Sequence, residues 1–291
     1  MNITLALISR NLNVYLRDRT AIFFSFLSVI IIIGLYALFL GDLQVSIIKS
    51  IAGDLEGIEW LVNGWIMAGI LTVNTVNITM AALGVMITDV ETNASKDFIS
   101  SPIKRGQVIL GYIGAAWILG IVMTLAAFFV VQFFIVFNGG EFLSFIATLK
   151  VIGVVIVSVI SFSSMLFFSA TFIRSSKAYG TFNSILGTLI GFLAGVYIPL
   201  GQFPDTVQKV VTVFPVSYSA AMMRQIFIEK PINKVFKHAP AGTMQEYKEF
   251  NGISLVFNDY EFSWWLMIGI LIALAFLFYL LSVLRLMKNK I

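Results

Sequence analysis

Six long apolar segments, separated by shorter polar stretches, dominate the pattern of hydrophobic and polar residues along the chain. A helix needs about 20 apolar residues to cross the roughly 30 Å of hydrocarbon in a bilayer, and each segment reaches that length. The pattern therefore predicts an all-α integral membrane protein with six transmembrane helices. We expect the spans at residues 20–40, 61–87, 108–137, 145–172, 180–200 and 262–284.

The composition agrees with this prediction and excludes several classes of protein. Hydrophobic residues make up 59% of the 291 residues and charged residues only 12%, against about 25% charged residues in an ordinary soluble domain. With so few charges, the chain is not expected to be a soluble enzyme, a disordered protein or a nucleic-acid-binding protein. It contains no cysteine and one histidine, His238, which excludes disulfides, thiolate metal sites and histidine-based zinc sites.

Basic residues in the loops predict how the chain is oriented in the membrane. Eleven Lys and Arg residues lie at the two termini and in the loops after the second and fourth spans, whereas the two short loops on the other side hold only Lys49 and Lys150. Cytoplasmic loops are enriched in Lys and Arg. We therefore expect both termini in the cytoplasm and the long loop of residues 201–261 outside it.

Residues 1–19 predict an amphipathic helix before the first span. At 100° per residue, five apolar side chains cluster on one face and polar side chains on another, although Leu7 and Val14 break the pattern. One interpretation is a helix that lies in the cytoplasmic interface of the membrane. The alternative is a basic flank that only sets the topology. The clustered apolar residues are Leu5, Ile8, Leu12, Tyr15 and Leu16.

The loop after the second span predicts a short charged helix. Asp89 and Glu91 suit a helix N-terminus, and Lys96 lies further along, as the helix dipole favours. Pro102 disfavours the helical conformation at Ser101, so the helix should end there. Such a helix on the cytoplasmic face can insert into a groove of a soluble partner. The alternative interpretation is an ordinary solvated loop.

Polar and small residues mark two of the predicted spans. Asn74 and Asn77 lie in the second span, and amides inside hydrocarbon are costly unless they are paired or face a cavity. They either line a substrate path or hold helices together. In the fifth span Gly187, Gly191 and Gly195 recur every four residues, with Asn183 one turn earlier. Glycine ridges allow close helix packing, or they leave room for a moving gate.

A set of short motifs accompanies these features. Two of them are Arg17-Asp18-Arg19 before the first span and Ser101-Pro-Ile-Lys-Arg105 in the first cytoplasmic loop. Four more come at the end of the fifth span and after it: Tyr197-Ile-Pro199, Phe203-Pro204, Phe214-Pro215-Val-Ser-Tyr218 and Met223-Arg224-Gln225. Their order resembles that of ABC-2 type exporter permeases, closest to multidrug and haemolysin exporter permeases of Gram-positive bacteria. The last motifs are similar to the Pro-rich re-entrant external hairpin that this family carries before its last span. The segment Lys230–Asp259 is longer and more charged than in the family.

The resemblance implies a permease subunit of an ATP-binding cassette exporter, which moves an amphipathic small molecule, drug, toxin or lipid-like cargo out across the bacterial cytoplasmic membrane. It implies two partners: a cytoplasmic ATPase subunit that binds ATP and Mg, and a second permease copy or a paralogue. This chain carries no nucleotide-binding motif, so we expect it to bind no cofactor and to have no enzymatic activity. By the same resemblance, residues 88–107 form the coupling loop, with Asp89, Glu91, Lys96, Asp97 and Phe98 facing the ATPase.

Two other functions stay open at this point. Within the family, the cargo can instead be a lipid-linked polysaccharide such as a teichoic acid precursor. Outside it, an ion-coupled secondary transporter has the same hydrophobicity, but the predicted spans are almost free of the charged residues that proton and ion relays use. The resemblance further implies that Asn74, Asn77 and Asn183 face a substrate path at the centre of a dimer.

Overall fold

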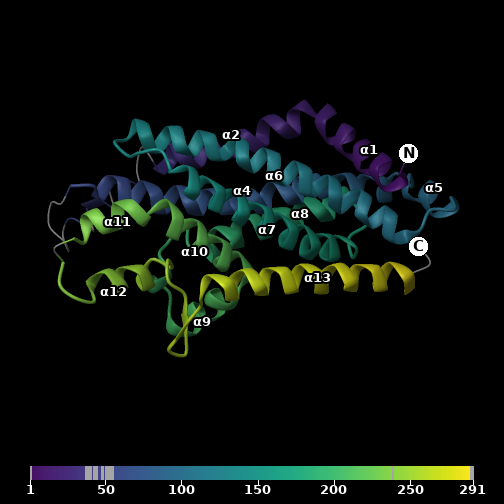
Figure 1. The fold of residues 1–291 in the computed structure, drawn as a ribbon. Coiled ribbons are helices and arrows are strands. Elements are labelled where there is room, and N and C mark those ends of the chain that lie inside the picture. Colours follow the sequence, from purple (N-terminus) through teal and green to yellow (C-terminus); the bar gives the residue numbers. More distant parts are fainter. Residues whose placement is uncertain are drawn as a thin grey trace.

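A computed structural model describes residues 2–36, 41, 45, 46, 49, 56–237 and 239–288 of the chain. The end of the predicted first span and His238 lie outside these residues. Four long helices run side by side and form the body of the molecule (Figure 1). They are α4 (Ile58–Glu91), α6 (Arg105–Phe137), α7 (Phe145–Ala170) and α13 (Trp264–Lys288).

Among the described residues, these four helices are long and apolar enough to cross a membrane. A fifth candidate is the pair α1 (Ile3–Arg17) and α2 (Arg19–Leu35), which is bent by 74°. The prediction of a helical membrane protein is therefore confirmed, whereas the count of six spans stays a prediction. The predicted fifth span corresponds to α8 (Ser176–Leu193), which ends seven residues before the predicted boundary.

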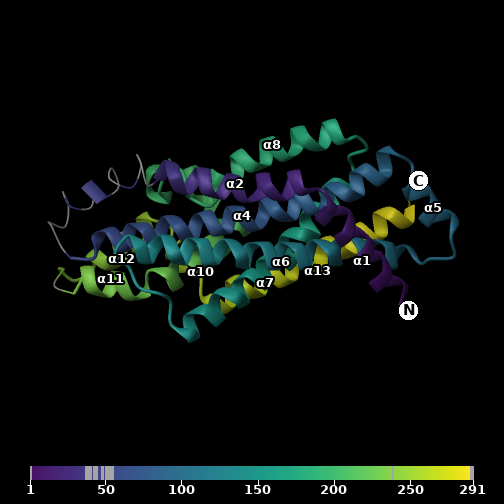
Figure 2. The ribbon, with the colours of Figure 1, turned by 90° about the horizontal axis from the view of Figure 1, so that it is seen from above.

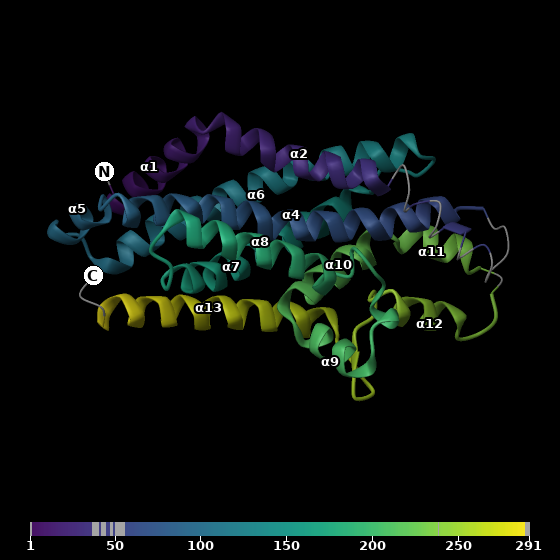
Figure 3. The same ribbon diagram turned by 180° about the vertical axis from the view of Figure 1, so that it is seen from behind.

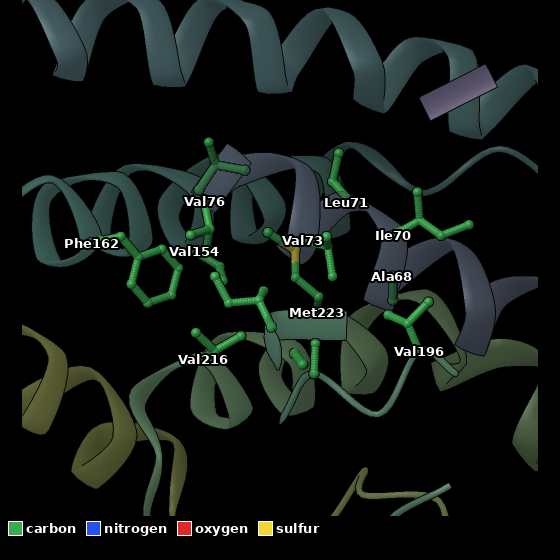
Figure 4. Packing of buried hydrophobic residues seen from close by; sticks show 14 of the residues in the cluster. Ala68, Ile70, Leu71, Val73, Val76, Val154, Phe162, Val196, Val216 and Met223 are labelled. Carbon is green, nitrogen blue, oxygen red and sulfur yellow. The ribbon is translucent and has the colours of Figure 1, made fainter. Parts of the chain in front are cut away.

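Helix α4 lies at the centre of the bundle, and the other helices pack around it. In its most apolar stretch 83% of the residues are buried, against 22% in α13. Figure 2 shows α7 and α8 on opposite sides of α4. In the core, apolar side chains of α4, α7 and the cap helix α10 (Pro215–Phe227) interdigitate, among them Val76, Val154, Phe162 and Met223 (Figure 4). This core joins α10 to the two long helices.

The predicted external loop forms a folded cap at the end of the bundle away from the two termini (Figure 1). Within it, α10 is buried and packs against α4 and α7. Pro215 is the first residue of α10, where a missing N–H costs no hydrogen bond. The other cap elements are η2 (Leu200–Gln202), α9 (Asp205–Val213), α11 (Glu229–Val235), α12 (Thr243–Phe250) and the antiparallel pair β1 (Val256–Phe257) and β2 (Tyr260–Glu261).

The N-terminal segment is helical as predicted, but its buried face is shifted around the helix and shares only Tyr15 with the fully buried part of the predicted face. Leu5 is 61% exposed, whereas Leu7, which breaks the amphipathic pattern, is 9% exposed. The reason lies in α6, where Gly111 makes room for the Leu7 side chain: a Cβ at Gly111 would lie 2.7 Å from the Leu7 Cβ. Leu7 is therefore buried because α6 has a glycine opposite it. The sequence pattern of the N-terminal segment alone cannot reveal this contact.

Candidate functional site: the loop after α4 and the polar faces of α4 and α8

The predicted loop helix exists, but it begins later than expected. Helix α4 continues without a break to Glu91, and Asn93 turns the chain with a left-handed φ of 63°. The short helix α5 (Ser95–Ser100) follows and ends before Pro102, as predicted. The interpretation of Asp89 and Glu91 as N-terminal residues of the loop helix is wrong, because both lie in the last turn of α4.

Asp89 points into the protein and joins three helices. Its side chain is 6% exposed, although it lies near the C-terminus of α4, where the helix dipole disfavours a negative charge. The Arg10 guanidinium of α1 offsets this by binding both carboxylate oxygens, with Nη2 2.7 Å from Oδ1. The Tyr112 hydroxyl of α6 donates a third hydrogen bond at 2.7 Å. The end of α4 is thereby tied to α1 and to α6.

Glu91 makes a comparable link to α8. Its carboxylate accepts hydrogen bonds from the backbone N–H of Ser176, at 3.2 Å, and from the Ser176 hydroxyl. Ser176 is the first residue of α8, and a helix N-terminus favours a nearby negative charge. Ser175 caps the same helix by accepting from the Ala178 N–H at 3.2 Å. Glu91 therefore does serve a helix N-terminus, but that of α8.

The remaining loop residues are more accessible. Lys96 and Asp97 are exposed on α5, and Phe98 is half-buried with the Arg10 guanidinium carbon 5.6 Å from its ring centre. Of the five residues predicted to face an ATPase, Asp89 is buried, Phe98 is half-buried, and Glu91, Lys96 and Asp97 are exposed, although Glu91 also binds α8. Their role in docking stays a prediction.

The structure brings two of the three predicted path residues to one contact between helices. Helix α8 runs alongside α4 (Figure 3), and Asn77 faces Gly187, where a Cβ would lie 3.8 Å from the Asn77 Oδ1. Asn183 lies one turn before Gly187, and its buried Oδ1 has no hydrogen-bond partner among the described residues. Asn74 is 3% exposed, and its Nδ2 is likewise unpaired in that part of the chain.

The three glycines do not form one helix ridge, because α8 ends at Leu193. Gly191 lies beneath the ring of Tyr197, which a Cβ at this position would overlap. Gly195 lies beyond the helix with a left-handed φ of 60°, which favours glycine. It closes the helix as a Schellman turn, in which the Val196 N–H donates to the Gly191 carbonyl at 2.9 Å. Gly187 alone has the predicted role of helix contact.

Sequence analysis missed the role of Arg224, which is 2% exposed at the centre of the cap. Its guanidinium donates to the carbonyls of Ala194 and Gly195 at 2.6 and 2.7 Å and lies 4.7 Å above the Trp65 ring. A buried cation needs such acceptors, so Arg224 holds the turn after α8 against α4. The available signal was one arginine in the otherwise uncharged segment that became α10.

Comparison with known proteins identifies one family. The family model described as ABC-2 type transporter matches residues 3–228. The match runs from α1 to the end of α10, and it includes the loop after α4 and both polar helix faces. No curated protein matches the chain.

Proposed function

Since this chain belongs to the ABC-2 type transporter family, we propose that it is the permease subunit of an exporter driven by a separate ATPase. The family match over residues 3–228 is the observation that carries this proposal, and the long apolar helices agree with it. The cargo is an amphipathic molecule that leaves the cell across the cytoplasmic membrane. ATP and Mg bind to the partner ATPase, and this chain performs no hydrolysis.

We place both termini and α5 in the cytoplasm, with α2 and α8 completing six spans. The start of α1, the end of α13 and α5 lie at the same end of the bundle (Figure 1), as an even number of crossings requires. The basic residues Arg105 and Arg174 lie in loops or helix ends on that side, which is the enrichment expected of a cytoplasmic face.

The ATPase docks on the exposed surface of α5, where Lys96 and Asp97 are accessible. When ATP binding moves the ATPase, α5 moves with it. Asp89 and Glu91 then transmit the movement, because they connect the end of α4 to α1, α6 and α8. This division assigns docking to the exposed residues and transmission to the two carboxylates that already have partners within the chain.

Cargo passes beside the contact of α4 with α8, in an assembly with a second permease. The Asn74 Nδ2 and the Asn183 Oδ1 have no partner among the described residues and need one, or water. The outer side of α8 exposes Ile185 and Leu189, a surface that a second copy can cover. The alternative is that the amides only hold helices together. If so, Asn77→Leu lowers the melting temperature and leaves cargo-stimulated hydrolysis unchanged. If the amides line a cargo path, Asn77→Leu instead changes cargo-stimulated hydrolysis and leaves the melting temperature unchanged.

Docking is tested by reversing one exposed charge. We expect Asp97→Lys to reduce recovery of the ATPase with the tagged permease severalfold, without changing the amount of permease in the membrane. Glu246→Lys is the matched control, because Glu246 is also exposed but lies on α12 in the cap. If both variants retain the ATPase and full cargo-stimulated hydrolysis in proteoliposomes, α5 is not the docking element.

A further inference from the structure

A cavity of about 170 Å³ lies between α4, α5, α6, α7 and α13, at the end of the bundle where the two termini lie. Most of its wall is apolar, and none of its lining residues is acidic. The side chains of Met86, Phe98, Val108, Phe167 and Leu286 contribute to the apolar wall, together with Ile173 from the segment after α7.

Two arginines add positive charge to this apolar wall. The Arg105 guanidinium donates to the Leu286 carbonyl and so bridges the start of α6 to the end of α13. Arg174 is exposed, and no carboxylate in the described part of the chain lies within ion-pair distance of it. The nearby Asp89 does not cancel this charge, because Arg10 binds both of its carboxylate oxygens.

A third arginine lies at the same corner. The guanidinium carbon of Arg285 is 3.4 Å from the ring centre of Phe172. The two sequence neighbours of Phe172, Thr171 and Ile173, line the cavity. The Arg285 Nε is buried and has no acceptor among the described residues. Phe172 is 55% exposed and Leu284 is 50% exposed, so apolar side chains that suit lipid stand directly beside the cationic groups.

We propose that this cavity binds an anionic phospholipid of the cytoplasmic leaflet. The phosphate lies at Arg174 and Arg105, and one acyl chain enters the apolar wall near Val108 and Phe167. Basic pockets between transmembrane helices on the cytoplasmic side are suited to anionic headgroups, and the apolar wall distinguishes a lipid from a free anion. This inference rests on the proposed orientation in the membrane, but it requires neither the ATPase nor a cargo.

The test measures lipid binding to the full purified chain in a neutral detergent by native mass spectrometry. We expect phosphatidylglycerol to bind more tightly than phosphatidylcholine of the same acyl chains. Arg174→Gln should weaken phosphatidylglycerol binding about fivefold, since one basic residue near a membrane surface contributes about 1 kcal/mol. Lys177→Gln is the matched control, because it removes the same charge from an exposed residue that does not line the cavity.

A second variant tests the acyl-chain part. Val108→Phe fills the cavity and keeps both arginines, and we expect it to weaken phosphatidylglycerol binding while the protein stays monodisperse. Equal binding of the two lipids, or equal effects of Arg174→Gln and Lys177→Gln, would overturn the proposal. Displacement of the lipid by glycerol 3-phosphate at a similar concentration would also overturn it in favour of a site for soluble phosphate. If transport is absent but lipid binding is intact, the proposed exporter function fails and the lipid site stands.

Discussion

Among the described residues, each end of the bundle buries one charged side chain, and the two ends neutralise it in different ways. At the end where the termini lie, Asp89 is bound by the side chains of Arg10 and Tyr112 from two other helices. At the cap end, Arg224 is bound by backbone carbonyls of the turn after α8. Side-chain contacts can break while each helix stays intact, whereas the contacts of Arg224 depend on the shape of the turn itself.

The two arginines also differ in how far their side chains are buried. The Arg10 side chain is 36% exposed, so water can replace Asp89 as its partner, whereas Arg224 is 2% exposed. An unpaired buried charge is far more costly than an exposed one. Both contacts bury a charge, but only the contact at the end with the termini includes a partly exposed charged partner, so we expect disruption at the cap to destabilise the fold more.

The largest effect is expected at the cap. Arg224→Met leaves at least two carbonyls without donors, and we expect it to lower the free energy of unfolding by about 3 to 5 kcal/mol, since each unsatisfied buried acceptor costs about 1 to 3 kcal/mol. Chemical unfolding followed by tryptophan fluorescence measures it. Arg19→Met makes the same chemical change at an exposed residue and should be nearly neutral. Similar losses in the two variants would remove Arg224 from its central role.

A smaller effect is expected at the opposite end. A double-mutant cycle of Arg10→Gln and Asp89→Asn should give a coupling energy of about 1 to 2 kcal/mol, because one partner is buried and the other is partly exposed. The same unfolding measurement on the two single variants and the double variant provides it. Strictly additive losses would mean that the two residues act independently and that α1 is not held by this contact.

A third prediction concerns the turn that Arg224 holds. Gly195→Ala should cost about 1 kcal/mol, because the left-handed conformation at this residue disfavours a Cβ. Gly180 lies within helical α8 and has open space around it. Gly180→Ala should therefore raise the free energy of unfolding, by up to about 1 kcal/mol. Melting temperatures of the two variants in one detergent test this difference. A gain in both would show that the turn conformation is not constrained.

The smallest effect comes from ion pairs on the surface of the cap. Lys234 donates to Glu56 at 2.6 Å, and this hydrogen bond lowers the pKa of the carboxyl group below its usual value. A lowered carboxyl pKa stabilises the folded state above the unfolded pKa of about 4.3, and this contribution disappears as the pH falls through the folded pKa. We expect a slightly steeper fall of the melting temperature below about pH 4.5 in the wild type than in Glu56→Gln. Identical pH profiles would show that the pair contributes nothing.

The class of the protein and several helix ends could be predicted from the sequence, because they depend on local properties. Apolar runs of membrane-crossing length need no knowledge of their neighbours, and they predicted α4, α6, α7 and α13. The end of α5 before Pro102 follows from a steric clash between adjacent residues. The motifs that resemble the ABC-2 type family are equally local in sequence, and the family match confirms them.

The features that the sequence did not reveal depend on contacts between distant segments. Whether Asp89 faces solvent or the interior depends on Arg10, 79 residues away, and the buried face of α1 depends on Gly111 of α6. Arg224 acquires its role only because folding brings the turn after α8 against it. Sequence by itself thus determined four long apolar helices, the end of the loop helix and the family, since hydrophobicity and backbone sterics act locally. Tertiary structure alone decided which charges are buried and what neutralises them, since that depends on which side chains meet.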